Sequence, residues 1–367
     1  MKFVISREAL IKPLQLVAGV VERKSTLPVL SNVLLATDGQ ELSLTGTDLE
    51  VELVGHVTLE EPAEPGSITV PARKLMDICK SLPDAVSIQF ELSDSKLTVK
   101  AGRSSFTLST LPATDFPNIV DVDETFKVRL PQGDLRRIID KAAFSMAQQD
   151  VRYYLNGMLL ELDGPQLRTV ATDGHRLATC VTPVENNDQP KQQLIVPRKG
   201  ILELARLLAQ GDEEIELIIG ASHVRAQVGG YLYTTKRVDA TFPEYSRVIP
   251  TNGDKVMIGD RAALRQVFSR IAILSNEKYR GVRLMLEPGL LKVMANNPDQ
   301  EYAEETIAVD YDGEALEISF NVNYLMDVLS ILDSDEVRFT LYDSNSSALI
   351  NSEVEPGSLY VVMPMRM

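Results

Sequence analysis

The sequence repeats itself weakly, with a period of about 125 residues. Three motifs return in the same order and at the same spacing: residues 44–48 at 170–173 and 294–297, residues 70–77 at 196–203 and 320–327, and residues 115–117 at 241–243. This period is too long for a solenoid repeat, and it is long enough for a complete domain with its own core. The sequence therefore predicts three tandem copies of one domain, at residues 1–124, 125–253 and 254–367.

Each copy shows the same order of local patterns. Two amphipathic helices are expected per copy, because apolar residues recur at intervals of three and four in the segments 7–20, 71–82, 134–147, 197–209, 261–275 and 321–333. Pro71 and Pro197 are expected at the first helical position. Segments of alternating polarity, typical of strands, follow, and Asp173-Gly174 is a hairpin signal between two of them. The pattern predicts an α+β fold with the helices gathered on one face of a continuous sheet surface.

Charge is unevenly distributed along the chain. The 37 basic and 52 acidic residues give a net charge of −15, which on average argues against a nucleic-acid-binding protein. The first five predicted helices nevertheless carry net positive charge, and the sixth is acidic. Basic residues are also common on solvated helix faces. Together with the repeat, the pattern favours a helical face directed toward a polyanion and a strand face directed away from it.

Motifs for catalysis and for membrane insertion are missing from the sequence. It contains no P-loop, dinucleotide-binding glycine motif or nucleophile elbow, and its three histidines and two cysteines lack metal-ligand spacing. Asp173 and His175 suggest a catalytic pair, but Asp-Gly at a hairpin tip is far more often a turn. No apolar run approaches the roughly 18 residues of a membrane helix, and the N-terminus lacks a signal-peptide core. We therefore expect a cytoplasmic protein with reduced thiols.

Long strings of the sequence resemble one protein family from end to end. They are LPVLSN at 27–32, LSLTGTDLE at 42–50, QDVRYYLNG at 149–157, TVATDGHRLA at 169–178, ILSNEK at 273–278 and VVMPMR at 361–366. In these strings, in its length and in its triplication, the chain resembles the bacterial DNA sliding clamps, the beta subunits of the replicative DNA polymerase (DNA polymerase III).

The resemblance implies a fold and a function. We expect three clamp domains per chain in a head-to-tail homodimeric ring with pseudo-six-fold symmetry, its helices lining the hole and its antiparallel sheets outside. Such a ring encircles duplex DNA without sequence preference and confers processivity, with no chemistry, cofactor or metal of its own. The implied partners are duplex DNA, a second copy of the chain, the polymerase alpha subunit, an ATP-dependent clamp loader, and other proteins with a clamp-binding motif such as translesion polymerases, ligase and mismatch-repair proteins. No membrane is implied.

The resemblance also assigns three sets of residues by position. The DNA-facing set is Lys24, Arg73, Gln149, Tyr153, Tyr154, Arg198 and Lys199. Position 24 is often arginine in the family, and lysine keeps the charge but not the planar fork. The set for an apolar pocket that receives a short partner peptide is Leu155, Thr172, Gly174, His175, Arg176, Leu177, Pro243, Arg247, Val248, Ser347, Val361, Val362, Met363, Pro364, Met365 and Arg366. In the dimer contact Phe106 would pack on Ile273 and Leu274, and the facing charges are Lys74, Arg103, Glu301, Glu304 and Glu305.

Two other functions stay open on the sequence. One is an enzyme with an unrecognised site at Asp173 and His175, for which turnover lost on substitution of either residue would be evidence. The other is an acidic scaffold that binds peptides without DNA, which predicts a monomer and no dependence on DNA topology.

Overall fold

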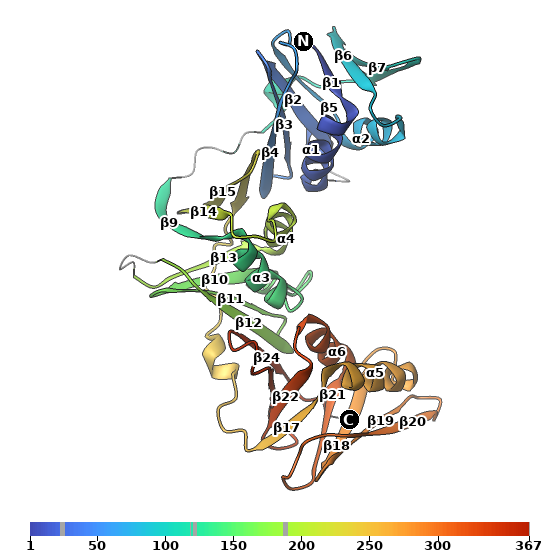
Figure 1. The fold of residues 1–367 in the computed structure, drawn as a ribbon, viewed down its shortest axis with the longest axis vertical. Coiled ribbons are helices and arrows are strands. Elements are labelled where there is room, and N and C mark those ends of the chain that lie inside the picture. Colours follow the sequence, from blue (N-terminus) through green and yellow to red (C-terminus); the bar gives the residue numbers. More distant parts are fainter. Residues whose placement is uncertain (23–25, 118, 120–122, 186–189, 367) are drawn as a thin grey trace. The chain divides into compact units, whose positions relative to one another are not determined.

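The computed structural model describes residues 1–22, 26–117, 119, 123–185 and 190–366. Within them the order of elements β-α-β-β-β-β-α-β-β-β occurs three times (Figure 1). The chain therefore contains three tandem α+β domains of one type, as the sequence period predicts. The domain boundaries at 124/125 and 253/254 remain a prediction.

The elements of the three copies have these bounds. The first copy comprises β1 (Lys2–Ser6), α1 (Arg7–Val20), β2 (Asn32–Asp38), β3 (Glu41–Thr47), β4 (Val51–Thr58), β5 (Gly66–Pro71), α2 (Ala72–Ser81), β6 (Ser87–Ser93), β7 (Lys96–Ala101) and β8 (Ser104–Ser109). The second comprises β9 (Glu124–Pro131), α3 (Gln132–Ala143), β10 (Gly157–Asp163), β11 (Gln166–Thr172), β12 (Arg176–Pro183), β13 (Gln192–Pro197), α4 (Arg198–Leu207), β14 (Glu214–Gly220), β15 (His223–Val228) and β16 (Tyr231–Lys236). The third comprises β17 (Lys255–Asp260), α5 (Arg261–Ile271), β18 (Gly281–Glu287), β19 (Leu290–Asn296), β20 (Tyr302–Ala308), β21 (Leu316–Asn321), α6 (Val322–Ile331), β22 (Glu336–Leu341), β23 (Ala348–Asn351) and β24 (Ser358–Val362). Short 3-10 turns lie at Pro28–Ser31 (η1), Ala113–Asp115 (η2), Tyr153–Leu155 (η3), Tyr245–Val248 (η4) and Ala272–Leu274 (η5).

The helix starts follow from local capping chemistry. Ser6 Oγ accepts a hydrogen bond from Ala9 N at 3.3 Å, and Asp260 Oδ1 accepts one from Ala263 N at 2.6 Å. Pro71 and Pro197 do not occupy the first helical position as expected. Both end a strand, and the helix begins at the next residue. Their N–H-free nitrogens therefore lie at the strand end, where the chain turns into the helix.

The chain divides into two compact units, residues 1–133 with 199–237 and residues 134–198 with 238–367. The first unit holds a four-stranded sheet, β1-β6-β7-β8, and an eight-stranded sheet, β5-β2-β3-β4-β16-β15-β14-β9. Helix α1 packs on β3 and β4. A Cβ at Gly46 of β3 would lie 2.6 Å from the Val17 carbonyl oxygen, so the close approach of α1 requires glycine there.

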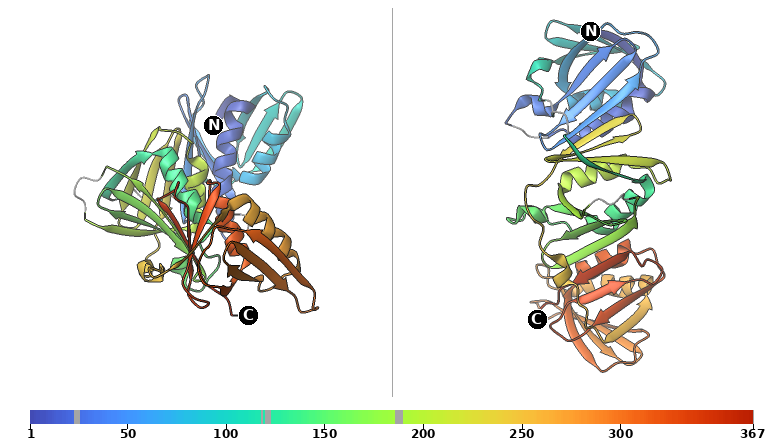
Figure 2. Two further views of the ribbon diagram at one scale, coloured as in Figure 1. Left: turned by 60° about the horizontal axis from the view of Figure 1, so that its bottom comes forward. Right: turned by 90° about the vertical axis from the view of Figure 1, so that its left-hand side faces the viewer.

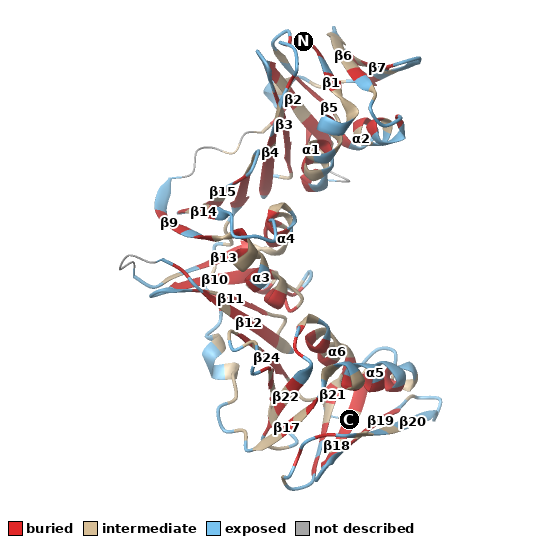
Figure 3. Ribbon diagram, in the orientation of Figure 1, coloured by how far each residue is buried: buried red, intermediate tan, exposed pale blue. Residues whose placement is uncertain are grey.

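The second unit is built in the same way. It holds a four-stranded sheet, β20-β19-β18-β21, and an eight-stranded sheet, β13-β10-β11-β12-β24-β23-β22-β17. The apolar strands β10, β11 and β12 are largely buried (Figure 3). Helices α5 and α6 pack on each other, as do α1 and α2 in the first unit (Figure 2).

Each eight-stranded sheet joins two copies of the repeat. In the first unit β16 pairs antiparallel with β4, and in the second β24 pairs antiparallel with β12. In both junctions the eighth strand of one copy pairs with the fourth strand of the copy before it. Within the described residues the other two strands of this type, β8 and β20, stand at the edges of their sheets.

The strand registers align the three copies residue by residue. In the hairpin formed by the last two strands, Phe106 opposes Val99, Tyr233 opposes Ala226, and Tyr360 opposes Ile350. Phe106, Tyr233 and Tyr360 are thus equivalent aromatic residues. Tyr233 and Tyr360 are fully buried, whereas Phe106 at the open edge is partly exposed.

Candidate functional site

The observed helices keep the predicted charge distribution. Helix α5 contains Arg261, Arg265 and Arg270 and no acidic residue, whereas the charged residue of α6 is Asp327. With the observed bounds, each of the first five helices still has a net positive charge. The acidic excess of the chain consequently lies in the strands, loops and α6.

The predicted DNA-facing cations have different surroundings. Arg73 of α2 is exposed, and Lys24 lies outside the described residues. Lys199 Nζ donates to the Val20 carbonyl at 2.6 Å and forms an ion pair with Asp48. Arg198 is half-buried and donates to the Met146 carbonyl at 3.2 Å. Arg73 is therefore the described cation of this set that is most open to solvent.

The pKa of Arg198 reflects its position at the start of α4. Burial, and then the nearby charge of Arg176, lower the pKa of its guanidinium below the usual value. Its Nη1 also lies 3.4 Å from the Ala143 carbonyl. Arg198 is thus held against the C-terminal end of α3, a location that sequence reasoning did not foresee.

Gln149, Tyr153 and Tyr154 belong to one exposed loop before β10. Gln149 adopts a positive φ of 55°, and the side chain of Asn156 braces the loop by accepting from Asp150 N at 2.9 Å. Tyr153 is 58% exposed, and its ring centroid lies 6.0 Å from that of Tyr154. The loop therefore presents the Gln149 amide and the Tyr153 ring to solvent, while the Tyr153 hydroxyl donates to the Asp239 carbonyl at 3.4 Å.

An ion pair fixes the rest of this loop. Arg152 Nη2 lies 2.8 Å from Asp150 Oδ2, and the hydrogen bonds from Arg152 hold the pKa of Asp150 at about 2. Arg152 Nη2 also donates to the Asp173 carbonyl at 3.2 Å. This contact ties the loop to the turn between β11 and β12.

The residues of the predicted peptide pocket come from five segments of the second unit. Leu155 of η3, Leu177 of β12 and Val361 of β24 belong to one buried cluster, against which Val248 of η4 packs. Backbone pairing places two further members of the set beside β12. Met363 N donates to the His175 carbonyl at 2.9 Å, and Val362 opposes Arg176. These apolar members of the set are therefore brought together.

The turn at Asp173 is a hydrogen-bonded turn. Asp173 Oδ1 accepts from His175 N at 2.9 Å and from Arg176 N at 3.0 Å, and Gly174 adopts a φ of 88°. The other carboxylate oxygen accepts from Arg176 Nε at 3.2 Å. Both oxygens of Asp173 bind groups of its own turn, which confirms the turn expected from the sequence.

Arg176 holds β12 against the third copy. Its guanidinium pairs with Asp327 of α6, lies 4.6 Å from the ring centroid of Tyr324, and donates to the Phe144 carbonyl at 2.9 Å. The side chain is largely buried by these contacts. Arg176 thus braces the wall of the predicted pocket.

Other members of the pocket set lie toward its rim or beyond it. Arg247 pairs with Glu244 at 2.6 Å and is exposed, and Pro243 lines a neighbouring cavity of about 340 Å³. Ser347, Met363 and Pro364 are half-buried. Met365 N donates to the Ser319 carbonyl of β21 at 2.7 Å, and Met365 and Arg366 line a separate cavity described below.

Sequence reasoning missed the group that anchors η4. The carboxylate of Glu161 is 3% exposed and accepts from the Tyr245 hydroxyl at 2.6 Å and from Gln193 Nε2 at 2.5 Å, with Lys191 Nζ at 3.0 Å. Burial acts to raise the pKa of Glu161, but these donors outweigh it and lower the pKa. The sequence signal that could have found Glu161 is its place as the one acidic residue in the otherwise apolar stretch 158–162.

The predicted dimer residues lie on the two open edges and near them. Ile273 of η5 is 75% exposed and Leu274 is half-buried, while Lys74 and Arg103 are exposed. Glu304 and Glu305 of β20 have partners within the chain: Lys292 at 2.7 Å and Arg270 at 2.5 Å. Glu301 is exposed at the start of the same edge.

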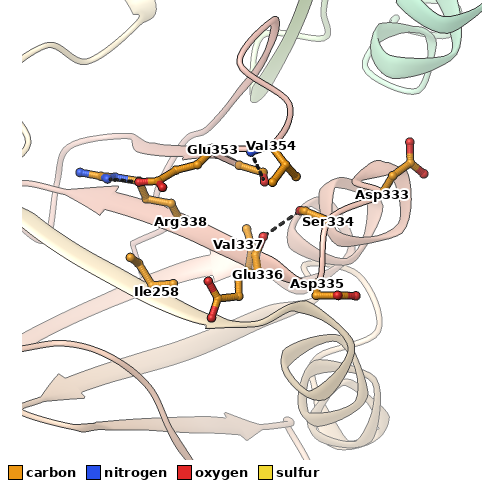
Figure 4. Close-up of a pocket in the computed structure, with 10 residues that line it drawn as sticks. Ile258, Asp333, Ser334, Asp335, Glu336, Val337, Arg338, Glu353 and Val354 are labelled. Carbon is orange, nitrogen blue, oxygen red and sulfur yellow. Dashed lines mark hydrogen bonds and ion pairs between the residues drawn. The ribbon is translucent and has the colours of Figure 1, made fainter.

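A cavity of about 610 Å³ lies between the end of α6, β22 and residues 352–354 (Figure 4). Asp335, Glu336 and Glu353 give it an acidic lining, and Arg338 pairs with Glu353 at 3.3 Å. In the described part of the chain no group of three or more His, Cys, Asp or Glu residues is placed to hold a metal ion. None of the described helices has the length and apolar character needed to cross a membrane.

Comparison with known proteins covers the whole chain. Family models of the DNA polymerase III beta subunit match residues 1–120 (N-terminal domain), 129–244 (central domain) and 246–366 (C-terminal domain). The chain is 62% identical to the beta sliding clamp of Pseudomonas aeruginosa and 51% identical to that of Escherichia coli K12, with all of both chains covered in each case.

Solved structures agree with these matches. The crystal structure of the DNA polymerase III beta subunit of Pseudomonas aeruginosa superimposes with a TM-score of 0.96 at 62% identity, covering 100% of both chains. A further structure of this Pseudomonas aeruginosa clamp, with the same TM-score, identity and coverage, is bound to griselimycin. The Caulobacter crescentus clamp matches with a TM-score of 0.94 at 39% identity, covering 100% of this chain and 99% of that one. This chain belongs to the family of the DNA polymerase III beta subunit, the beta sliding clamps.

Proposed function

We propose that this chain closes into a head-to-tail homodimeric ring around duplex DNA and there tethers the polymerase. Its family is that of a polymerase processivity subunit without catalytic activity, which implies DNA and polymerase as partners. That membership makes the enzyme hypothesis at Asp173 and His175 unnecessary. The main support for the ring is the repeated strand pairing between copies, β16 with β4 and β24 with β12. This pairing leaves β8 and β20 as sheet edges.

A third junction of the same type would join β8 of one chain to β20 of another. An exposed strand edge is a ready template for pairing, and an edge on each side of every chain allows a heterologous contact that closes when the rotation permits. Tyr233 opposes Leu53 and Tyr360 opposes Ala178 in the existing junctions. By equivalence of register, Phe106 would oppose Ala303 of the second chain.

Side-chain packing supports the same contact. In the closed junction of the second unit, the ring of Tyr360 lies 5.9 Å from that of Phe144, just after α3. Ile273 occupies the equivalent place just after α5, and it is exposed. Phe106, equivalent to Tyr360, would therefore cover Ile273 of the second chain. This agrees with the dimer contact expected from the family resemblance.

The DNA contact that we propose is weak and independent of sequence. Phosphate contacts from Arg73, Arg198, Lys199 and Lys24, with Gln149, Tyr153 and Tyr154, would position the duplex without reading bases. Arg198 and Lys199 also bind carbonyl oxygens of their own chain, so charge reversal there changes the fold as well as the DNA contact. Arg73→Glu is the cleaner test of this role.

We further propose that the apolar cluster at Leu155, Leu177 and Val361 receives peptide motifs from partner proteins. Met363 adds a polarizable side chain that adapts to different peptides. The expected partners are the polymerase alpha subunit, the clamp loader, and proteins such as translesion polymerases, ligase and mismatch-repair proteins. We expect the protein in the cytoplasm, where this DNA lies.

The ring can be tested by cross-linking the proposed edges. Ser105 would oppose Glu304, and directly opposed Cα atoms of antiparallel strands lie at a separation that suits a disulfide. The double variant Ser105→Cys/Glu304→Cys should oxidise to a covalent dimer with both junctions closed. Cys79 and Cys180 are buried and should not interfere.

The matched control moves one cysteine by two residues on the same strand face. The pair Ser105→Cys/Thr306→Cys should remain largely reduced. Equal cross-linking of both pairs, or a protein that stays monomeric, would contradict the proposed register and favour the monomeric scaffold.

A further inference from the structure

The three repeats contain the same groove at the edge of the sheet. Leu34 opposes Thr69, Leu159 opposes Ile195, and Arg283 opposes Ser319 at equivalent places in the three copies. A later segment then runs along each of these edges. It is bound through Leu111 N to the Thr69 carbonyl at 3.1 Å, Val238 N to the Ile195 carbonyl at 2.9 Å, and Met365 N to the Ser319 carbonyl at 2.7 Å.

In the first two copies an aromatic residue of the same chain fills the groove. Phe116 is 4% exposed and is buried with Leu30, and Leu34 and Leu111 pack against them. Phe242 of the second copy is likewise buried, in the cluster that contains Leu155 and Leu159 and against which Val238 packs. Proline follows both phenylalanines in the sequence.

The third copy has a cavity of about 480 Å³ at the equivalent place. Tyr279 stands where the other copies have Leu30 and Leu155, two residues before the start of the second strand. Arg283 and Met365 occupy the positions of Leu34 and Leu111, and both line the cavity. Within the described residues, which run to Arg366, no phenylalanine enters it.

We propose that this third groove, lined by Tyr279, Arg283, Met365 and Arg366, binds a segment of another protein that carries an acidic residue followed by Phe-Pro. The two filled grooves each hold a Phe-Pro segment of the chain itself, Asp115-Phe116-Pro117 in the first copy and Thr241-Phe242-Pro243 in the second, and the first of them carries the acidic residue. The site is distinct from the pocket at Leu155 and Leu177, and the tail from Val361 to Arg366 runs from one to the other.

The lining suits this occupant. The phenylalanine ring would pack on the 56% exposed ring of Tyr279 and on the thioether of Met365. The exposed Arg366 supplies a positive charge for the acidic residue, while Arg283 is already paired with Glu317 at 3.3 Å. Three asparagines also line the cavity. Asn297 already binds Glu301, and the oxygen of Asn276 accepts from Lys278 N and Tyr279 N, so Asn296 and the Asn276 Nδ2 group would meet the backbone of the segment. These polar groups allow water to occupy the third groove when no segment is bound. The two filled grooves, by contrast, are lined by leucine.

The test uses the full chain and a synthetic peptide labelled at its N-terminus. The peptide has the sequence of residues 111–117 of the chain, Leu-Pro-Ala-Thr-Asp-Phe-Pro. Fluorescence anisotropy should show saturable binding below about 1 mM. Replacing the phenylalanine of the peptide by alanine, or Tyr279→Ala in the protein, should weaken binding at least tenfold, because a buried aromatic ring contributes about that factor or more. Tyr342→Ala, at another exposed tyrosine of the third copy, should leave binding unchanged.

Two further measurements decide where the peptide binds. With benzoylphenylalanine in place of its phenylalanine, illumination should cross-link the peptide to residues 276–298 or 365–366. The peptide motif that the family resemblance implies for the pocket at Leu155 and Leu177 carries a glutamine and a leucine or phenylalanine. An unlabelled peptide with this glutamine and leucine should not displace the labelled peptide. No saturable binding, equal binding by the alanine peptide, or displacement by the partner motif would each overturn the proposal. If the partner-motif peptide displaced the labelled peptide, the proposal of a third-copy site would fail, but the proposal of a peptide pocket at Leu155 and Leu177 would stand.

Discussion

The closed junction between β12 and β24 and the open edges β8 and β20 use the same strand positions with different outcomes. In the closed junction Tyr360 is fully buried beside Phe144. At the open edges Phe106 and Ile273, which occupy the equivalent places, are exposed to solvent in part or in full. The open edges are therefore two halves of the same kind of junction, and the proposed contact between two chains would complete it.

The two closed junctions also differ from each other. Leu177 opposes Val361 in the second unit, whereas Glu52 opposes Thr234 at the equivalent place in the first. Glu52 is buried, and desolvation raises the pKa of its carboxyl even though Ile119 N donates to it. The junction in the second unit therefore has an apolar pair at this place, whereas the junction in the first unit has a buried carboxyl group whose hydrogen bonding is incomplete.

The largest predicted effect separates the closed junction from the open edge. Tyr360→Ala should lower the free energy of unfolding by about 4 kcal/mol, because it leaves a cavity in a packed core. Phe106→Ala should change the stability of the isolated chain by less than about 1 kcal/mol and instead weaken dimerisation. Urea unfolding at low concentration and sedimentation at several concentrations measure the two effects. Equal loss of chain stability in both variants would show that the closed junction and the open edge do not differ in this way.

The next effect concerns the charges that hold α3 to the third copy. Lys141 is buried, with its Nζ 2.6 Å from Glu355 and 2.8 Å from Asp333. Lys141→Met should cost about 3 kcal/mol, because it leaves the largely buried Glu355 carboxylate without its cation. The control Lys127→Met removes an exposed cation that is paired with Glu124 and Glu216, and it should leave the stability nearly unchanged. Thermal unfolding compares them, and similar losses would argue against a role of Lys141 in the junction.

Tyr245→Phe tests the hydrogen bond that anchors the wall of the predicted pocket. The hydroxyl of Tyr245 donates to the buried Glu161, and its pKa is raised to about 12 by burial and by this bond. Removing it should cost about 2 kcal/mol of stability near pH 7. The hydrogen-bond donors around Glu161 lower its pKa. The stability that they provide is therefore present above the unfolded-state pKa of this carboxyl and is lost as the pH falls through its folded-state pKa. Denaturant unfolding at pH 7 and pH 4 should therefore show a smaller difference at pH 4, and a constant difference would refute this link.

The smallest effect tests the polar junction. A raised pKa means that protonated Glu52 stabilises the fold below the unfolded-state pKa and that this contribution is lost as the pH rises through the folded-state pKa. Glu52→Gln should therefore stabilise the chain at pH 7, by about 1 kcal/mol, and have less effect near pH 4. Melting temperatures measured across this range provide the check. A destabilised variant at pH 7 would mean that the ionised carboxylate is well satisfied in the junction.

The fold was largely predictable because its strongest signals are local. The repeat, the six helices and the Asp173 turn follow from periodicity and turn chemistry within short windows. The joining of β16 to β4 and of β24 to β12 was not predicted, since pairing between copies leaves no mark on the period of either strand. The proline positions were misplaced by one residue because a strand runs directly into each second helix.

The candidate site was predictable in part. Family resemblance assigned Arg198 and Lys199 to the DNA-facing set, but it could not reveal that both donate to carbonyl oxygens of distant segments. Family resemblance grouped Leu155, Leu177 and Val361, which the structure buries in one cluster. The bracing roles of Arg176 and Glu161 depend on tertiary contacts more than 80 residues away in sequence, and no local pattern encodes them.

A ring of the proposed kind holds DNA by encircling it. The most direct test is retention on nicked circular DNA, loaded with ATP and a clamp-loader fraction, before and after the circle is linearised. We expect the protein to stay on closed circles and to leave through the free ends once the DNA is cut. Equal retention on circular and linear DNA would show binding by direct contact and would contradict the ring.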